Sequence, residues 1–230
     1  GLNTTAMSGQ VVQLHEHIDP VGGNVIYATT DDNKGWRSTD EAATFTDVTN
    51  TATVTDPNMQ IVSFRGVVLG FQDGSGPIVL SAASTNLGAT GQPTRDVAVA
   101  AFGRVWAKDT DTSLKYSALL DETDWTGSDT GGIDLTSVWP TADVITAITA
   151  FSGNLIVFSK RHIVIFNDTN GSPLGLDPVE AAVVELISGI GCVARDSIAS
   201  VKGDLWFLDD TGVHSLRRLV DTESNPIDNL

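Results

Sequence analysis

The sequence predicts an all-β protein built as a β-propeller-like array of antiparallel blades, each with three or four strands. The main observation is a repeat in which an apolar stretch runs into a glycine turn, a second apolar stretch and a polar turn. Successive anchor glycines lie 43, 37, 50 and 50 residues apart, which is the range of propeller blades and too long for a leucine-rich repeat. Helical periodicity is almost missing from the chain. We therefore expect one propeller-like domain over residues 1–230, either incomplete or closed by other segments.

Five repeat units align on their glycines. Their turns are Val21-Gly22-Gly23, Phe64-Arg65-Gly66, Ala101-Phe102-Gly103, Phe151-Ser152-Gly153 and Val201-Lys202-Gly203. The last four suit two-residue hairpins, because glycine adopts the required positive φ without strain; these glycines are Gly66, Gly103, Gly153 and Gly203. Each glycine should lead into a strand that pairs antiparallel with the preceding segment, at 24–30, 67–71, 104–108, 154–159 and 204–208. The units cover residues 10–50, 59–88, 96–127, 143–168 and 179–220.

The second turn of most units is polar. Asp, Asn, Gly and Pro, which tolerate or preset turn dihedrals, gather at residues 31–35, 73–77, 109–112 and 209–212. The fourth unit has a tight basic turn instead, Ser159-Lys160-Arg161. Residues 154–158 and 163–166 are apolar on both faces of the pleat, which predicts buried strands.

The segment from Asp177 to Ile187 allows two interpretations. Asp177 and Pro178 have the features of a helix start, with Asp as the N-cap and Pro in the first turn. Residues 179–187 are rich in β-branched side chains and are followed by Ser-Gly-Ile-Gly, which favours a strand. We predict the strand, with the helix as the alternative.

The composition is that of a globular protein. Hydrophobic residues make up 41% of the 230, enough for a real core. Cys192 is the single cysteine, so no intrachain disulfide can form, and we expect it to be a small buried residue. We see no signal peptide and no apolar run near the ~18 residues of a membrane span. A start at Gly1 suggests processing or a segment of a longer protein.

The chain is strongly acidic. Asp and Glu number 29 against 13 Lys and Arg, a formal net charge of -16. This argues against wrapping nucleic acid, since each phosphate contact needs a Lys or Arg. The basic doublets are Lys160-Arg161 and Arg217-Arg218. A negative channel wall would repel DNA and let it slide, which the sign of the charge permits.

No catalytic constellation stands out, and we expect no enzyme. A sialidase would need several arginines and a tyrosine nucleophile, but Tyr27 and Tyr116 are the only tyrosines and neither has arginines clustered nearby in sequence. Chance pairs of carboxylates are unavoidable among so many acids, so they do not indicate a glycosidase. Phosphate loops, nucleotide fingerprints and serine elbows are also missing.

Metal and cofactor sites are not predicted either. His15 and His17 would share one face of a strand and could ligate a metal, but the spacing marks no third ligand, and solvated side chains are the plainer interpretation. The turn acids lack the ligand density of an EF-hand: Asp31, Asp32, Asp109 and Asp111. His162 and His214 should be packed or hydrogen-bonded.

The tryptophans fall into two groups. Trp106 and Trp206 occupy the same place in their units, so both should face a neighbouring sheet and be buried there. The other three lie near turns and are candidates for contacts with another subunit, where aromatics are enriched: Trp36, Trp125 and Trp139.

Residues 38–45 resemble the Asp-box of sialidase-like propellers, a Ser-x-Asp-x-Gly-x-Thr-aromatic turn. The matching residues are Ser38, Asp40, Thr44 and Phe45, with Ala42 in place of the usual glycine. The resemblance implies a turn clasp between outer strands, in which the Asp accepts backbone N–H bonds and the aromatic packs inward. It indicates architecture and not catalysis.

A longer resemblance covers roughly the last 130 residues. These resemble the propeller portion of short-tail bacteriophage nozzle, hub and packaged-DNA stabilisation proteins, including the tail tubular protein B type. The match rests on Tyr116-Ser117, Asp124-Trp125, Thr146 to Phe158, Gly191-Cys192 and Asp204 to Ser215. Known relatives are usually longer, with platform or tip domains as well.

This resemblance implies a structural virion protein of the phage tail, assembled in the bacterial host cytoplasm. Its partners would be copies of itself in a ring, commonly sixfold, and other tail proteins such as the adaptor and fibres. Phage DNA would pass through the ring without specific binding. No catalytic residue belongs to the pattern. The alternative function is a carbohydrate-binding or sialidase-like glycan-cleaving propeller.

Overall fold

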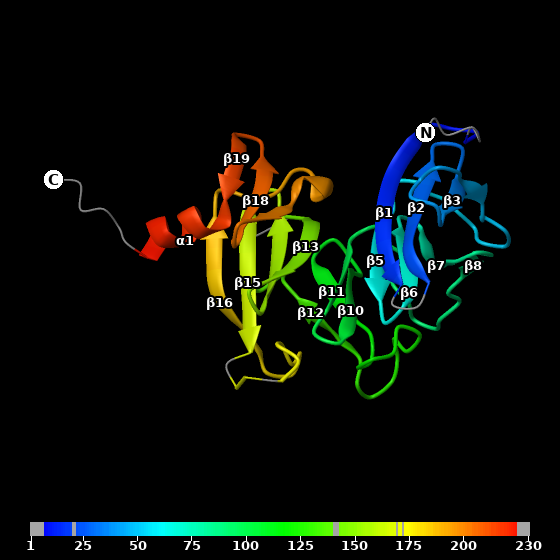
Figure 1. Cartoon of the computed structure of the whole chain (residues 1–230). Coiled ribbons are helices and arrows are strands. Elements are labelled where there is room, and N and C mark those ends of the chain that lie inside the picture. The colour runs from blue at the N-terminus through cyan, green and yellow to red at the C-terminus, as the bar shows by residue number, and fades with distance from the viewer. Residues whose placement is uncertain (1–6, 20–21, 140–142, 169, 172, 225–230) are drawn as a thin grey trace. The chain divides into compact units, whose positions relative to one another are not determined.

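The computed structural model describes residues 7–19, 22–139, 143–168, 170–171 and 173–224 (Figure 1). These residues form five antiparallel sheets that follow one another along the chain. The helices among them are one 3₁₀ turn, η1 (Arg195–Ser197), and one short α-helix, α1 (Leu216–Ser224). The protein is therefore all-β, an array of propeller-like blades with almost no helix, and the predicted fold class is confirmed.

Each sheet is formed by strands that are consecutive in sequence and pair with their neighbours. The first sheet contains β1 (Val11–Asp19), β2 (Gly23–Thr30), β3 (Lys34–Ser38) and β4 (Thr46–Asp47). The second contains β5 (Gln60–Phe64), β6 (Val67–Gln72), β7 (Ser75–Leu80) and β8 (Thr85–Asn86). The third contains β9 (Ala98–Ala101), β10 (Arg104–Lys108), β11 (Ser113–Tyr116) and β12 (Gly131–Asp134). The fourth contains β13 (Ile145–Phe151), β14 (Asn154–Ser159), β15 (His162–Asp168) and β16 (Ala181–Ser188). The fifth contains β17 (Ala199–Val201), β18 (Asp204–Asp209) and β19 (Gly212–Ser215).

The chain divides into two compact units. Unit 1 comprises residues 1–110 and 114–133, and unit 2 comprises residues 111–113 and 134–230. Unit 1 holds the first two sheets and almost all of the third, whereas unit 2 holds the fourth and fifth sheets with α1. The expectation of a single domain did not anticipate this division.

The anchor glycines close tight hairpins, as predicted. In the last four units the residues flanking the turn pair directly, for example Phe151 with Asn154 and Val201 with Asp204. Both turn residues have positive φ, 50° and 79° at Ser152 and Gly153, which is the geometry of a type I′ turn. The first unit differs, because Asp19 pairs with Gly23 across a longer loop. All five strands predicted after the glycines are present.

The predicted boundaries of the third, fourth and fifth units are wrong, because two outer strands were misplaced. Residues 181–188 form strand β16 and not a helix, which confirms the predicted strand, but β16 pairs with β15. It therefore completes the fourth sheet, and the fifth unit begins at Ala199 instead of residue 179. The third unit extends past residue 127 to include β12. Both errors arise because the outermost strand of a blade follows a long loop, which the glycine repeat does not mark.

Packing between consecutive sheets supplies the core of unit 1. The first two sheets bury a cluster that includes Val25, Tyr27, Ile61, Val68 and Ile78. The second and third bury another that includes Leu69, Phe71, Val105, Ala107 and Trp125. Phe71 and Trp125 meet edge to face with ring centroids 6.4 Å apart, a preferred aromatic geometry.

Unit 2 has one core between its two sheets and its helix. Ile156 and Phe158 of the fourth sheet pack on Leu205 and Phe207 of the fifth, and Leu216 of α1 closes the cluster. The ring centroids of Phe158 and Phe207 lie 5.0 Å apart. Residues 155–158 and 163–166 are buried at every position, as predicted for strands covered on both faces, whereas Asn154 of the predicted segment 154–158 is only partly buried.

Replacement of the anchor glycines should cost stability through backbone strain alone. The φ angles of Gly153 and Gly203 are 79° and 78°, and no atom lies within 4 Å of the position a Cβ would take at either residue. We expect Gly153→Val and Gly203→Val each to lower the free energy of unfolding by about 1–3 kcal/mol, measured by urea denaturation.

The matched control is asparagine at the same positions, since asparagine tolerates the left-handed region far better than a β-branched residue. Gly153→Asn and Gly203→Asn should therefore lose clearly less stability than the valine variants. Equal stability of wild type and both valine variants would contradict the left-handed geometry.

Candidate functional site

The Asp-box resemblance corresponds to a real turn clasp. Asp40 accepts hydrogen bonds from the Thr44 backbone N–H at 2.9 Å and the Thr44 hydroxyl at 2.6 Å. The Ser38 hydroxyl donates to Asp40 at 2.7 Å and accepts from the Ala42 N–H at 3.1 Å. The hydrogen bonds from Thr44, followed by that from Ser38, lower the pKa of Asp40 to about 2. The loop is thus held by an ionised carboxylate, as the resemblance implies.

This clasp places an aromatic side chain over the outer face of the first sheet. Phe45 is buried against Trp36 and Ala28, and Ala42 and Met7 pack on the same cluster. Ala42 has φ +64° at the position where the Asp-box usually has glycine. The loop therefore covers the part of the face formed by β2 and β3.

The three tryptophans expected at a subunit interface are core residues instead. Trp36, Trp125 and Trp139 are only 6%, 1% and 2% exposed. Two of them satisfy their indole N–H groups within their own unit, Trp36 with the Thr30 hydroxyl and Trp125 with the Glu122 carbonyl, both at 2.9 Å. Trp139 lies against the His162 ring, with centroids 6.3 Å apart. Proximity to turns misled the prediction, because these large side chains fold back under the sheets.

The paired prediction for Trp106 and Trp206 is half correct. Trp106 is fully buried and packs on Tyr116, with the ring centroids 5.0 Å apart. Its indole N–H donates to the Ala101 carbonyl at 3.2 Å. Trp206 is 43% exposed. Its neighbours Leu205 and Phe207 face the fourth sheet, so Trp206 points to the opposite side of β18. The chain continues from this sheet as helix α1, which packs on the inner side with Leu216.

The outer face of the fifth sheet is apolar and exposed. Trp206 and Leu208 of β18 lie on it, and Val213 of β19 pairs directly with Leu208. Val201 of β17 adds a fourth apolar side chain, opposite Asp204. We call Val201, Trp206, Leu208 and Val213 the terminal face; their exposures are 44%, 43%, 37% and 64%.

A second exposed apolar strip lies on β1. Val12, Leu14 and Ile18 lie along one side of this strand, with the exposed Glu16 between Leu14 and Ile18; Leu14 and Ile18 are 63% and 72% exposed. Residues 13, 15 and 17 point to the other side, toward the second sheet, where His15 and His17 reach Ser63. We call Val12, Leu14 and Ile18 the first-strand patch.

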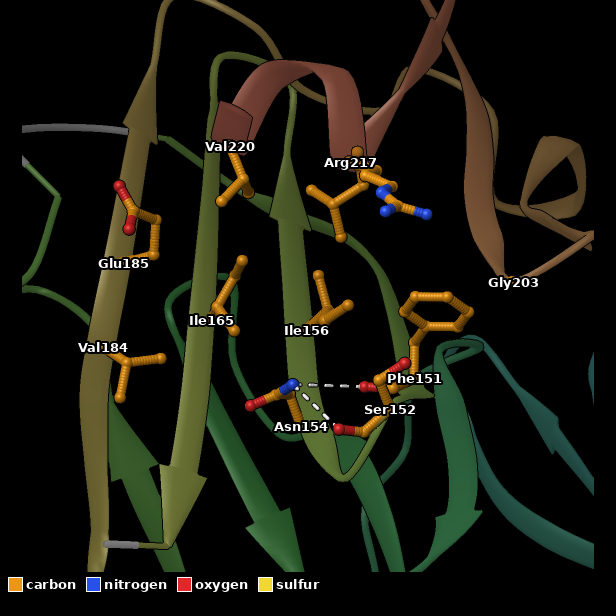
Figure 2. A pocket seen from close by; sticks show the side chains of 11 residues that line it. Phe151, Ser152, Asn154, Ile156, Ile165, Val184, Glu185, Gly203, Arg217 and Val220 are labelled. Carbon is orange, nitrogen blue, oxygen red and sulfur yellow. Dashed lines mark hydrogen bonds between the residues drawn. The ribbon is translucent and has the colours of Figure 1, made fainter. Parts of the chain in front are cut away.

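A pocket of about 440 Å³ opens in unit 2 beneath α1 (Figure 2). Its apolar walls come from the fourth sheet and the helix: Phe151, Ile156, Ile165, Val184, Leu216 and Val220. The Asn154 amide is already used, because it donates to the Phe151 and Ser152 carbonyls and accepts from Asn167 at 2.6 Å. Glu185 and Arg217 provide the charge among the lining residues. The pocket can hold an apolar group but contains no acid, base and nucleophile in contact.

Ser159, His162 and Asp143 form a cluster that looks like a triad but is a turn brace. The Ser159 hydroxyl and His162 Nδ1 both contact the same oxygen of Asp143, the latter at 2.8 Å. Ser159 is fully buried and also accepts the His162 backbone N–H at 2.8 Å. Burial raises the pKa of Asp143, but the hydrogen bonds from Ser159 and His162 outweigh it and the net shift is downward. A hydroxyl aimed at the carboxylate and not at the imidazole is not activated as a nucleophile.

The remaining histidines are hydrogen-bonded. His214 contacts the Thr211 hydroxyl at 2.9 Å and stacks on Phe207, which agrees with its predicted structural role. His15 and His17 share one face of β1, as predicted, and both reach the hydroxyl of Ser63 on β5.

The other candidate residues are structural where the structure describes them. Asp31 accepts the Gln10 N–H at 2.8 Å and Asp32 binds Ser8 and Thr30. In the described ranges no three His, Cys, Asp or Glu side chains, including Asp109 and Asp111, gather closely enough to hold a metal. Cys192 is fully buried, as expected, and burial raises the pKa of its thiol.

The tyrosines lie in two different sheets. Tyr27 is buried between the first and second sheets. Tyr116 packs on Trp106 in the third, with the Arg104 guanidinium 5.4 Å from its ring centre. Neither tyrosine lines the described pocket.

Arg104 is one of several buried charged residues that escaped the sequence analysis. Arg104 is 6% exposed and donates to the Ser117 carbonyl at 2.9 Å and to Asp129, where the carboxylate contact is 2.7 Å. This hydrogen bond is the main cause of the lowered pKa of Asp129. The guanidinium ties β10 to the loop before β12, and no local motif marked the pair.

Among the described helices, none has the length and apolarity needed to cross a membrane.

Comparisons with known proteins identify the fold and no family. No protein-family model matches the chain, and no curated protein matches it. Solved structures do match, and those named below are β-propeller proteins. At such low identity the likeness shows the fold alone.

Three of these structures illustrate the likeness. BamB from Moraxella catarrhalis is 12% identical, with a TM-score of 0.55 over 92% of this chain and 59% of BamB. BBS1N, crystallised in complex with ARL6DN, is 11% identical, with a TM-score of 0.54 over 92% of this chain and 65% of BBS1N. YCF48 from Cyanidioschyzon merolae is 10% identical, with a TM-score of 0.51 over 80% of this chain and 63% of YCF48. The chain spans less than two thirds of each of these proteins.

Glycine at position 42 should stabilise the clasp. Ala42 has φ +64°, a conformation that costs an L-residue roughly 1–2 kcal/mol and glycine little. After the greater unfolded-state entropy of glycine is subtracted, we expect Ala42→Gly to raise the free energy of unfolding by about 1 kcal/mol in urea denaturation.

The adjacent Ala43 offers the control, because its φ is not among the positive ones. Ala43→Gly should leave stability unchanged or lower it, since it adds entropy to the unfolded chain without relieving strain. If Ala42→Gly destabilised the protein as much as Ala43→Gly, the loop would not have the Asp-box conformation.

Proposed function

We propose that this protein is a non-enzymatic structural subunit of a bacteriophage tail, assembled with copies of itself into a ring around the DNA path. Support for the tail comes from the sequence resemblance over roughly the last 130 residues. The solved structures share the fold across different functions and therefore do not select this role. The observation that carries the proposal is the pair of exposed apolar surfaces on the first and fifth sheets.

Each blade presents apolar side chains on both faces and depends on a neighbour to cover them. The end repeats of a stacked array need a polar outer face if they are to remain alone in solution. The terminal face is apolar instead, and the first-strand patch is the uncovered remainder of the first sheet. The terminal face of one copy would therefore pack on the first-strand patch of the next.

The net charge fits a channel that DNA passes through without adhering. Duplex DNA is a polyanion, and binding it requires several Lys or Arg side chains that release counterions together. The chain has 29 acidic and 13 basic residues, and the basic doublets Lys160-Arg161 and Arg217-Arg218 are its densest positive sites. A ring of such subunits would repel the duplex.

Carbohydrate binding is the second candidate, favoured by the exposed indole of Trp206. An exposed aromatic ring can stack on the apolar face of a sugar, and the intact Asp-box clasp is shared with sialidase-like propellers. Trp36 and Trp125 cannot serve this purpose because they are buried. In this alternative the protein would work as a monomer, and Trp206→Ala would abolish its affinity for glycans.

Charges on either surface should prevent assembly. We expect the wild-type chain to form multimers in light scattering coupled to size exclusion, and Val213→Asp and Ile18→Asp each to shift it to monomer, because burying an unpaired carboxylate is costly. Val179→Asp is the matched control, since Val179 is 84% exposed outside both surfaces, and it should assemble normally. A wild-type chain that remains monomeric, and is never found in phage particles, would sink the proposal.

The purified chain should also fail to hold duplex DNA. At near-physiological salt we expect a dissociation constant of about millimolar or higher in fluorescence anisotropy. This affinity is weaker than that of typical non-specific DNA binding. A basic DNA-binding protein of similar size serves as the positive control in the same buffer. Micromolar affinity that weakens steeply with added salt would refute the repelling channel.

A further inference from the structure

Two imidazoles and a hydroxyl converge at one point between the first and second sheets. His15 Nε2 lies 2.8 Å from the Ser63 hydroxyl oxygen, and His17 Nδ1 lies 2.9 Å from the same oxygen. The histidines are two apart on β1 and pair with Tyr27 and Val25, so they occupy the same side of the strand. Ser63 comes from β5 of the next sheet. The cluster therefore joins two elements that share no backbone hydrogen-bond ladder.

The hydroxyl and the two rings can satisfy one another when no ion is present. A serine hydroxyl has one proton to donate, and a neutral imidazole has one donor and one acceptor nitrogen. When Ser63 donates to one ring, the unprotonated nitrogen of that ring accepts the hydroxyl proton and the other ring donates its N–H to the serine oxygen. A bound ion would replace both hydrogen bonds and take up the unprotonated nitrogens. Such a nitrogen is the form in which imidazole ligates a metal.

The surroundings favour the neutral form of the His15 ring. His17 is 7% exposed and His15 is partly buried. Burial, together with the nearby His17, lowers the pKa of His15. A net charge of -16 over the whole chain also favours the approach of cations.

We propose that His15 Nε2, His17 Nδ1 and the Ser63 hydroxyl bind a divalent transition-metal ion, with water completing the coordination. The ion would clamp β1 onto β5. Two nitrogen ligands select metals that prefer imidazole, namely Cu²⁺, Ni²⁺ and Zn²⁺, over the oxygen-seeking Ca²⁺ and Mg²⁺. Cu²⁺ should bind most tightly, following the general order of divalent affinities. The site is independent of the proposed tail function.

Calorimetric titration of the full chain with Cu²⁺, Zn²⁺ and Ca²⁺ salts tests this site directly. We expect one Cu²⁺ per chain, weaker binding of Zn²⁺ and none of Ca²⁺. His15→Gln should weaken Cu²⁺ and Zn²⁺ binding by at least about tenfold, because even outer-shell partners of metal ligands are worth that much. His214→Gln is the matched control and should bind as wild type, since His214 contacts Thr211 in another sheet.

A second readout guards against misfolded variants. Because a ligand that binds only the folded state stabilises it, Zn²⁺ should raise the unfolding midpoint of wild type and His214→Gln but not that of His15→Gln. His15 is the better residue to replace, being less buried than His17. Equal Cu²⁺ affinity in wild type and His15→Gln, or no one-to-one binding tighter than about millimolar, would overturn the proposal.

Discussion

The structure depends on the packing of one sheet face on the next. A three- or four-stranded sheet cannot bury its apolar face alone, so its stability comes from the neighbouring blade. The contact of Phe158 with Phe207 in unit 2 and that of Phe71 with Trp125 in unit 1 are both of this kind. The same constraint explains the Asp-box loop, whose Phe45 covers a face that no described sheet covers. The terminal face is likewise an apolar sheet face, and its side chains remain exposed.

The repeat was predictable because its signals are local. A type I′ turn demands positive φ at consecutive positions, and glycine at the second of them marks four of the hairpins. Two strands could be predicted from their β-branched, apolar sequences alone: β14, which is buried, and β16, of which only Ile187 is buried. The assignment of β16 to a sheet could not, because nothing in its own residues shows which neighbour it pairs with.

The burial and contacts of individual side chains were less predictable, since they depend on residues distant in sequence. The tryptophans near turns were expected at the surface, but Trp125 lies in a core built from the second and third sheets. Trp106 and Trp206 occupy equivalent positions and differ only in what covers them. Of the histidine cluster, the spacing of His15 and His17 indicated the shared face, whereas Ser63 lies 46 residues from His17 and carries no motif.

The first-strand patch and the terminal face consist of different residues on different sheets, which constrains the symmetry of an assembly that joins them. Two copies that met through one shared patch would form a closed two-fold dimer. A surface that fits a different surface instead produces a directional chain, in which every added copy offers the same open end as the last. Such a chain stops growing only if the rotation at each contact divides evenly into a full turn. A small change in the rotation at each contact would therefore turn the proposed ring into an open filament.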